Sequence, residues 1–318
     1  MGRGLRIEFP GACYHVFSRG NEKKDIFRDD QDHYRFMKYL DEVKKDHKLF
    51  VFAYVLMPNH FHLVVETPES KLSDAMHDFN SRFSNYFNYK YKRTGHLFQG
   101  RYNAILVQKT NYLMELTRYV HLNPVRAGIV KKLKDYRWSS YQEYIGKDSW
   151  RNISSKEWAL SAFGNSAYTA LKGYKKYLSQ GKGVDESIYE EGNFAGKILG
   201  TLDYAKEILE RFGYTKELKA ISAPSPESIL RLIADDFQTA PQIILQGPAS
   251  TERNISLKIL RSQTPLKLKE LAKMFALTHT TVSKAISKLE SECKENAHLN
   301  QRLTRLINAL EPAETTNK

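Results

Sequence analysis

The chain has 318 residues, of which 41% are hydrophobic and 27% charged, a composition typical of a globular protein with one or two domains. It has 49 Lys and Arg against 36 Asp and Glu, a formal net charge of +13, together with 19 Tyr and 16 Phe. No apolar run is long enough to span a membrane, and the two cysteines, Cys13 and Cys293, support neither a disulfide framework nor a zinc knuckle. Charge and aromatic content together favour nucleic acid as the partner, with a merely basic enzyme as the alternative.

The first part of the chain alternates strand-like and helix-like stretches. Strands are predicted at 12–20, 48–56, 61–67 and 100–108, and helices at 29–47, 73–93 and 110–124. Met57-Pro58-Asn59 joins the second and third strands as a tight turn, and the last helix starts at a Thr110 cap and must end near Pro124. This order predicts an α+β fold, a ferredoxin-like split βαβ antiparallel sheet with helices on one face, in a domain comprising residues 1–147.

The remainder divides into two further parts. Residues 148–225 mix helical stretches with Gly-rich ones and end in ISAPSPES, which is typical of a linker. Residues 226–318 are predicted to form an all-α domain, and within 264–292 two apolar stripes flank a short break. That spacing is typical of a helix-turn-helix, although an ordinary helical hairpin has the same pattern.

A short stretch of the third strand, MPNHFHLVVE, contains the most informative pattern. Because strand side chains alternate, His60 and His62 share one face and their nitrogens can converge on one metal ion. Tyr119 and Asn123 are four residues apart, so that they share one face of the last helix of this part. An amide oxygen suits a metal, and a cation beside the phosphate would help a tyrosine act as nucleophile. The alternatives are polar histidines in a sheet and a tyrosine ring packed on it.

Three motifs carry a resemblance to a known family. His60-Phe61-His62 resembles the HUH motif of single-tyrosine DNA nucleases, in which U is a bulky apolar residue. MPNHFHLVVE, GHLFQGRY (95–102) and RYVHLNPVRAGIV (118–130) together resemble one branch, the REP-associated tyrosine transposases, over residues 5 to 145. The fold of that family is the split βαβ sheet predicted above.

The resemblance implies a role for each matching residue. It assigns the metal ligands to His60, His62 and Asn123 and the nucleophile to Tyr119, with Mg²⁺ or Mn²⁺ as cofactor. It implies cleavage of single-stranded DNA, at hairpin-forming palindromic repeats, through a 5′-phosphotyrosine that a 3′-hydroxyl can reverse. Basic residues around the site are predicted to hold phosphates: Arg82, Arg93, Arg101 and Arg118.

The C-terminal part is similar to the duplex-DNA-binding domain of the replication initiator DnaA. The similarity lies in LKLKELAKMFALTHTTVSKAISKLE, where His279, Thr280, Thr281 and Lys284 are the predicted DNA contacts. The Arg-Asp pair expected before the histidine is replaced by Leu277-Thr278, so the arginine contact is missing.

Taken together, the residues predict a metal-dependent single-stranded DNA endonuclease and strand transferase with a duplex-binding module. The alternative is a DNA-binding regulator with a degenerate nuclease domain. The expected setting is the bacterial cytoplasm, in association with the nucleoid and without membrane contact, because no secretory signal is visible at the N-terminus. The expected assembly is a monomer or a homodimer.

Overall fold

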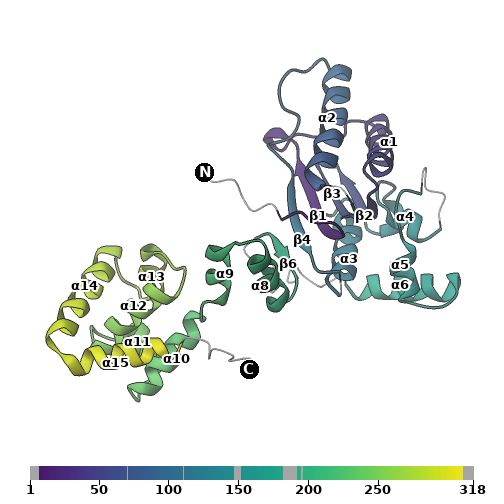
Figure 1. Cartoon of the computed structure of the whole chain (residues 1–318). Helices are drawn as coiled ribbons and strands as arrows, with labels where there is room; N and C mark the ends of the chain where they lie inside the picture. The colour runs from purple at the N-terminus through teal and green to yellow at the C-terminus, as the bar shows by residue number, and fades with distance from the viewer. Residues whose placement is uncertain are drawn as a thin grey trace. The chain divides into compact units, whose positions relative to one another are not determined.

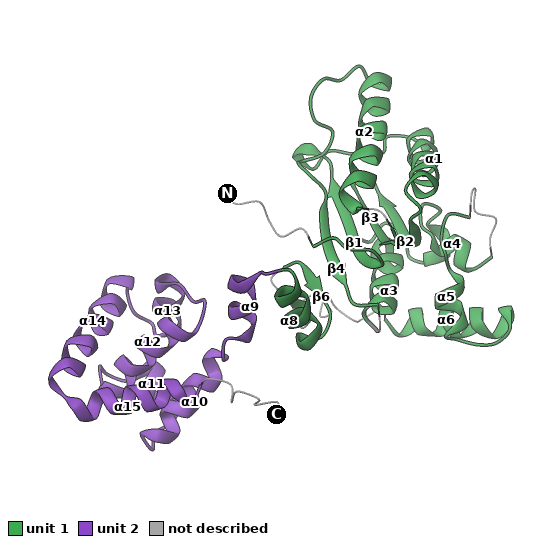
Figure 2. Ribbon diagram, viewed as in Figure 1, with its two compact units in different colours: residues 1–212 green, residues 213–318 purple. Residues whose placement is uncertain are grey.

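The computed structural model describes residues 7–69, 71–109, 111–146, 152–181, 192–194 and 196–310 (Figure 1). The chain forms two compact units, residues 1–212 and 213–318, which Figure 2 shows in green and purple. The predicted cap Thr110 lies outside the described ranges. Within those ranges, no helix has the length and apolar character that a membrane crossing requires.

Four antiparallel strands form the centre of the first unit. They are β1 (Ala12–Arg19), β2 (Phe50–Met57), β3 (His60–Thr67) and β4 (Asn103–Val107), in the spatial order β2-β3-β1-β4. Helix α1 (Asp30–Asp46) connects β1 to β2, and α2 (Leu72–Lys90) connects β3 to β4. The predicted split βαβ arrangement is therefore confirmed.

The two faces of this sheet are covered by different helices. On one face, Phe61 of β3 packs against Phe36 of α1 and Phe79 of α2, with ring centroids 5.0 and 6.0 Å apart. On the other face, helix α3 (Asn111–Arg126) buries Leu116 and Val120 in a cluster that includes residues of β2, β3 and β4. Side-chain alternation thus decides which strand residues meet α3.

Helix α3 continues two residues beyond the predicted stop at Pro124. Proline lacks an N–H and therefore cannot donate to the carbonyl four residues earlier. The last turn still closes, because Ala127 N–H donates to Asn123 O at 2.9 Å and Ile129 N–H donates to Pro124 O at 2.9 Å. The helix then ends before Gly128, whose φ of 70° is accessible to glycine without strain.

The first compact unit extends well past the boundary predicted at residue 147. Two short strands extend the sheet, with β6 (Ile198–Leu199) parallel to β4 and β5 (Asn193–Phe194) antiparallel to β6. The further helical elements are η1 (Asn21–Lys23), η2 (Leu133–Asp135), α4 (Tyr141–Tyr144), α5 (Glu157–Ser161), α6 (Ala167–Gln180) and α8 (Leu202–Arg211). Ile198 is fully buried against β4, and Tyr174 of α6 is fully buried beside Tyr144 of α4. These buried contacts attach β6 to the sheet and α6 to α4.

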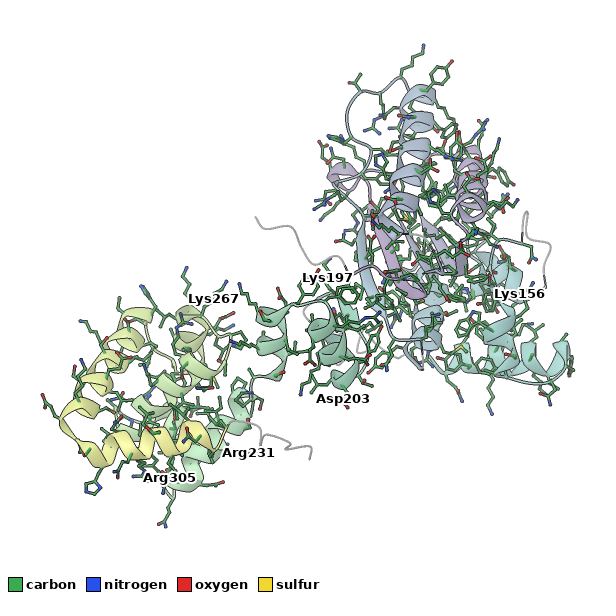
Figure 3. The ribbon with its side chains drawn as sticks, viewed as in Figure 1. Lys156, Lys197, Asp203, Arg231, Lys267 and Arg305 are labelled. Atoms are coloured by element: carbon green, nitrogen blue, oxygen red, sulfur yellow. The ribbon has the colours of Figure 1, made fainter. Side chains whose placement is uncertain are left out.

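The second unit is entirely helical in its described residues. Its helices are α9 (Thr215–Ser222), α10 (Pro226–Asp236), α11 (Pro241–Gln246), α12 (Thr251–Gln263), α13 (Leu268–Met274), α14 (His279–Glu295) and α15 (Ala297–Asn308). Asp236 pairs with Arg302 and with Arg305, the latter labelled in Figure 3. The predicted linker is short, because Ser225 already caps α10 by accepting a hydrogen bond from Ser228 N–H at 3.1 Å.

Helices α13 and α14 have the predicted apolar stripes. Leu271 and Phe275 are fully buried on the first, and Val282 and Leu289 on the second. The connection is tight, since Ala276 adopts a positive φ of 51°. Two packed helices with a four-residue connection agree with a helix-turn-helix.

Candidate active site

Two histidines begin strand β3 on the face that α3 covers. His60 is half-buried and His62 is buried, while Phe61 between them points to the opposite face. Their ring centroids lie 5.1 Å apart, with the ring planes at 84°. Two imidazoles at this separation can bind a single ion.

A hydrogen bond holds each of these imidazoles at Nδ1. His60 Nδ1 lies 2.6 Å from Asn59 Oδ1, and His62 Nδ1 lies 2.9 Å from His15 Nε2. Because Nδ1 is engaged in both rings, Nε2 is the nitrogen of each that can bind an ion. Outer hydrogen bonds of this kind orient metal-binding histidines and select their tautomer.

His15 is a site residue that the sequence analysis missed. It lies on β1, 47 residues before its partner His62, with the two rings stacked at a centroid distance of 5.0 Å. Phe17 of β1 pairs with His62 of β3. His15 lies two residues before Phe17 on β1 and therefore shares the face of His62. The only sequence signal was the alternation of ACYHVFSRG, which puts Cys13, His15 and Phe17 on one face.

Burial keeps the three histidine rings neutral. It lowers the pKa of His15 to about 3 and that of His60 to about 4, where the nearby Arg19 charge adds to the effect. Burial also holds the pKa of His62 well below its usual range, with smaller contributions from His15, His60 and Arg19. Neutral imidazole is the form that binds metal ions.

Helix α3 brings Tyr119 against the histidines. Its ring meets His62 edge-on at a centroid distance of 6.0 Å and His15 at 6.2 Å. The Arg126 guanidinium, two helical turns further on, lies 5.2 Å from the Tyr119 ring centroid. A cation near a phenol favours the tyrosinate and can also attract a phosphate.

Asn123 follows Tyr119 by one turn of α3 and is half-buried. Among the described residues, no group of three or more His, Cys, Asp or Glu side chains is arranged to hold an ion. A third protein ligand for the histidine pair would then come from another residue type, and an Asn amide oxygen is a suitable donor. The assignment of Asn123 as that ligand stays a prediction.

Arg19 is a second residue that the sequence analysis missed. It ends β1 directly opposite His60, and its side chain is exposed. Its charge acts on both His60 and His62. The register of β1 and β3 therefore places an exposed cation at the edge of the histidine pair.

Two of the four arginines predicted around the site are paired elsewhere. Arg82 on α2 pairs with Asp78, Asp46 and Glu42, at 2.7, 3.1 and 3.4 Å. Arg118 pairs with Glu115 and lies 4.4 Å from the Tyr177 ring centroid. Although Arg118 precedes Tyr119 in sequence, the helical rotation directs it towards α6.

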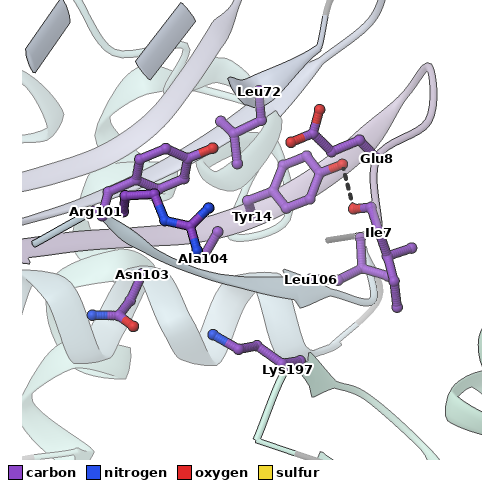
Figure 4. A pocket seen from close by; sticks show the side chains of 10 residues that line it. Ile7, Glu8, Tyr14, Leu72, Arg101, Asn103, Ala104, Leu106 and Lys197 are labelled. Carbon is purple, nitrogen blue, oxygen red and sulfur yellow. Dashed lines mark hydrogen bonds between the residues drawn. The ribbon is translucent and has the colours of Figure 1, made fainter. Parts of the chain in front are cut away.

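The other two arginines lie after α2. The Arg93 guanidinium stands 5.5 Å from the Phe87 ring centroid. Arg101 is exposed and lines two hollows, one of them on the sheet face opposite the histidines. That cavity has a volume of about 280 Å³, and Figure 4 shows Arg101 and Lys197 in its lining and the 3.0 Å hydrogen bond from Tyr14 Oη to Ile7 O.

The residues predicted to contact duplex DNA begin helix α14. His279, Thr280, Thr281 and Lys284 are all exposed. The cap is Thr278, whose hydroxyl accepts a hydrogen bond from Thr281 N–H at 3.2 Å. Their arrangement leaves the first turns of α14 open to a partner.

Known proteins resemble the part of the chain that holds the histidines and Tyr119. Residues 9–123 match the family described as "Transposase IS200 like". A REP-associated tyrosine transposase of Escherichia coli (strain K12) is 25% identical over 120 residues, which are 37% of this chain and 67% of that protein. A solved REP-associated tyrosine transposase bound to a REP hairpin is 18% identical with a TM-score of 0.41, over 49% of this chain and 92% of that one. These matches confirm the resemblance found in the sequence motifs: residues 9–123 are similar to IS200-like transposases.

Proposed function

We propose that the first unit cleaves and rejoins single-stranded DNA with Tyr119 as nucleophile. The observation that carries this proposal is the position of the Tyr119 ring, 6.0 Å from the His62 ring and beside a second, neutral histidine. The similarity of residues 9–123 to IS200-like transposases supports the same reaction. A tyrosine packed against a potential ion site has what a covalent phosphoryl transfer requires.

The residues present fit a divalent metal ion. His60 and His62 are neutral, are oriented through Nδ1 and share one face, while Asn123 would supply an oxygen. Mg²⁺ or Mn²⁺ bound there would neutralise charge that develops on the scissile phosphate. His15 and Asn59 keep the two ligand rings in place, so that little reorganisation accompanies binding.

The protein residues then carry out the transfer. The Tyr119 Oη atom forms a bond to phosphorus while the bond from phosphorus to the 3′ oxygen breaks. The phenol loses one proton and the leaving 3′ oxygen gains one, so the products are a 5′-phosphotyrosine and a 3′-hydroxyl. Arg126 beside the Tyr119 ring and Arg19 beside His60 are placed to hold phosphates next to the scissile one. Attack by a 3′-hydroxyl on the phosphotyrosine reverses the step.

The substrate and the second unit complete the proposal. The name of the solved relative says that it binds a REP hairpin, and a hairpin with unpaired DNA beside it is the substrate that we infer for this chain. The exposed start of α14 would hold duplex DNA, as its resemblance to the DnaA domain implies.

A covalent-adduct assay tests the nucleophile. The full chain is incubated with a labelled DNA hairpin that carries single-stranded tails, with Mg²⁺ or Mn²⁺, and then denatured. We expect a labelled protein band that Tyr119→Phe abolishes, because phenylalanine has no hydroxyl group with which to attack the phosphate. Tyr112→Phe, on the same helix and also half-buried, is the matched control and should keep the adduct. An adduct that persists in Tyr119→Phe would remove this tyrosine from its role.

A further inference from the structure

A polar groove lies between helix α2 and the segment 95–102. Its volume is about 860 Å³, within the range of pockets that bind small organic molecules, roughly 300–1,000 Å³. The α2 side presents Asn80, Ser84 and Asn88, and the facing segment presents Gln99 and Arg101. This row of amides and hydroxyls plays no part in the proposed chemistry of Tyr119.

The groove lies on the α2 face of the sheet, and the histidine pair lies on the other face at the same end of the strands. Gln99 N–H donates to Arg19 O at 2.9 Å, and Asn21 N–H donates to Leu97 O at 2.8 Å. Arg19 lies opposite His60 in the pairing of β1 with β3. Backbone hydrogen bonds therefore tie one wall of the groove to the strand end that stands next to the candidate metal ligands.

Two amide oxygens in this region have unmet hydrogen-bonding capacity. Asn80 Oδ1 and Asn88 Oδ1 are buried, and neither has a hydrogen-bond partner among the described residues. The amide nitrogen of Asn88 is engaged, because it donates to Gly95 O at 2.9 Å. A buried acceptor without a partner is unfavourable, so a ligand that brings N–H donors would be favoured.

The charge of the groove suits an anionic ligand. No Asp or Glu is present among the described residues that line it, and Arg101 supplies a positive charge. Asn and Gln amides offer a donor and an acceptor side by side, which is the pattern that matches the edges of nucleobases. These edges are open to such contacts in an unpaired strand, whereas in a duplex the pairing edges are occupied.

We propose that this groove binds the unpaired DNA strand next to the scissile phosphate and contacts its bases through the α2 amides. The inference rests on the proposed function, because it identifies where that substrate continues beyond the active site. Asn80 and Asn88 accept hydrogen bonds from base amino or imino groups. Arg101 holds a phosphate of the same strand.

Binding measurements on an uncleaving protein test the proposal. In the full-length Tyr119→Phe chain, the affinity for a labelled DNA hairpin with single-stranded tails is compared with that for the same hairpin without tails. Asn80→Ala should weaken binding of the tailed hairpin by about three- to tenfold, the effect of one or two hydrogen bonds. It should leave the untailed hairpin unaffected and should not lower Tm, because it removes an unsatisfied acceptor.

A charge substitution provides a second variant with a matched control. Asn85 is exposed and lines the groove, so Asn85→Asp adds a negative charge without disturbing the core. We expect about tenfold weaker binding of the tailed hairpin. Asn152→Asp adds the same charge where Asn152 accepts from Lys156 Nζ at 3.3 Å, outside the groove, and should bind as the parent does.

The outcomes separate this inference from the proposed function. If Asn80→Ala and Asn85→Asp bind the tailed hairpin as tightly as the parent while the Tyr119 protein still forms its adduct, the groove inference is wrong and the function stands. Equal weakening with and without tails would also overturn it, since the groove would then not contact the single strand. If the Tyr119 protein forms no adduct, the proposed reaction fails, whatever the groove variants bind.

Discussion

The two compact units place their candidate functional residues differently. In the first unit, His15, His60 and His62 come from two paired strands, are largely buried and interact with one another. In the second unit, His279 and Lys284 lie exposed at the start of one helix. The difference suggests different tasks: a buried, hydrogen-bonded cluster suits positioned chemistry, whereas an exposed helix face suits recognition of a surface.

Removal of His15 should give the largest effect in this comparison. His15→Leu removes the hydrogen-bond partner of His62 Nδ1 and should weaken Mn²⁺ binding about 10- to 100-fold, as loss of an outer hydrogen bond does at other metal sites. His15→Gln keeps a polar partner and should recover part of that affinity. Calorimetric titration of the full chain with Mn²⁺ measures both, without dependence on cleavage.

The control for His15 is a buried histidine away from the site. His33 stacks on Trp138 with ring centroids 4.1 Å apart, so His33→Leu should bind Mn²⁺ as the parent does. If His15→Leu binds Mn²⁺ as tightly as the parent, the hydrogen bond from His15 does not orient His62. The contrast between a positioned site in the first unit and an exposed surface in the second would then be wrong.

A smaller effect is expected from one exposed lysine of α14. Lys284→Ala should weaken duplex binding about equally for all sequences and reduce the salt dependence by about one ion, as loss of a phosphate contact does. Adduct formation by Tyr119 should not change, because Lys284 belongs to the other unit. Fluorescence anisotropy with a labelled duplex at several salt concentrations measures the slope.

Lys258→Ala is the matched control for Lys284. Lys258 pairs with Glu290 and its side chain is only 28% exposed, so its charge is already balanced within the unit. If both substitutions weaken duplex binding equally, the effect reflects the overall charge and not a contact of Lys284. If the parent chain does not bind duplex DNA, α13 and α14 serve only in packing.

The smallest effect is an acid sensitivity confined to the first unit. Burial lowers the pKa of His33 below its unfolded value of 6.5, so between these two values the unfolded chain binds more protons than the folded one. The contribution of His33 is therefore complete above pH 6.5 and decreases as the pH falls through that window. Between pH 7.5 and 5.5 we expect Tm of the first unit to fall, and His15, His60 and His62 add to the effect of His33 because burial lowers their pKa values as well.

Tryptophan fluorescence isolates that transition. Residues 213–318 contain no tryptophan, so the fluorescence does not follow the second unit, whereas far-ultraviolet circular dichroism follows both units. His33→Leu should reduce the acid sensitivity seen by fluorescence. An unchanged pH profile in this variant would show that other groups cause the effect.

Local sequence periodicity was enough to predict the central sheet and part of the candidate site. The period of two in MPNHFHLVVE put His60 and His62 on one face, because alternation depends only on the strand itself. The helical spacing of Tyr119 and Asn123 was equally local. Strand and helix order then predicted the split βαβ fold, which the strand pairing confirms.

Long-range features were missed for a common physical reason. The His15–His62 hydrogen bond depends on the register between β1 and β3, and Ile198 is buried only because β6 adds to the sheet beside β4. The ion pairs of Arg82 with Glu42 and Asp46 arise from the packing of α1 against α2. None of these contacts has a local periodic signal.

The sequence by itself thus determined the four strands and three helices around the central sheet, their order and which side chains share a face. Tertiary packing alone decided which faces meet: His15 with His62, Tyr119 with both, and α2 with the segment 95–102. Periodicity describes one element at a time, whereas a site requires several elements, and their relative placement follows from side-chain packing in the folded core.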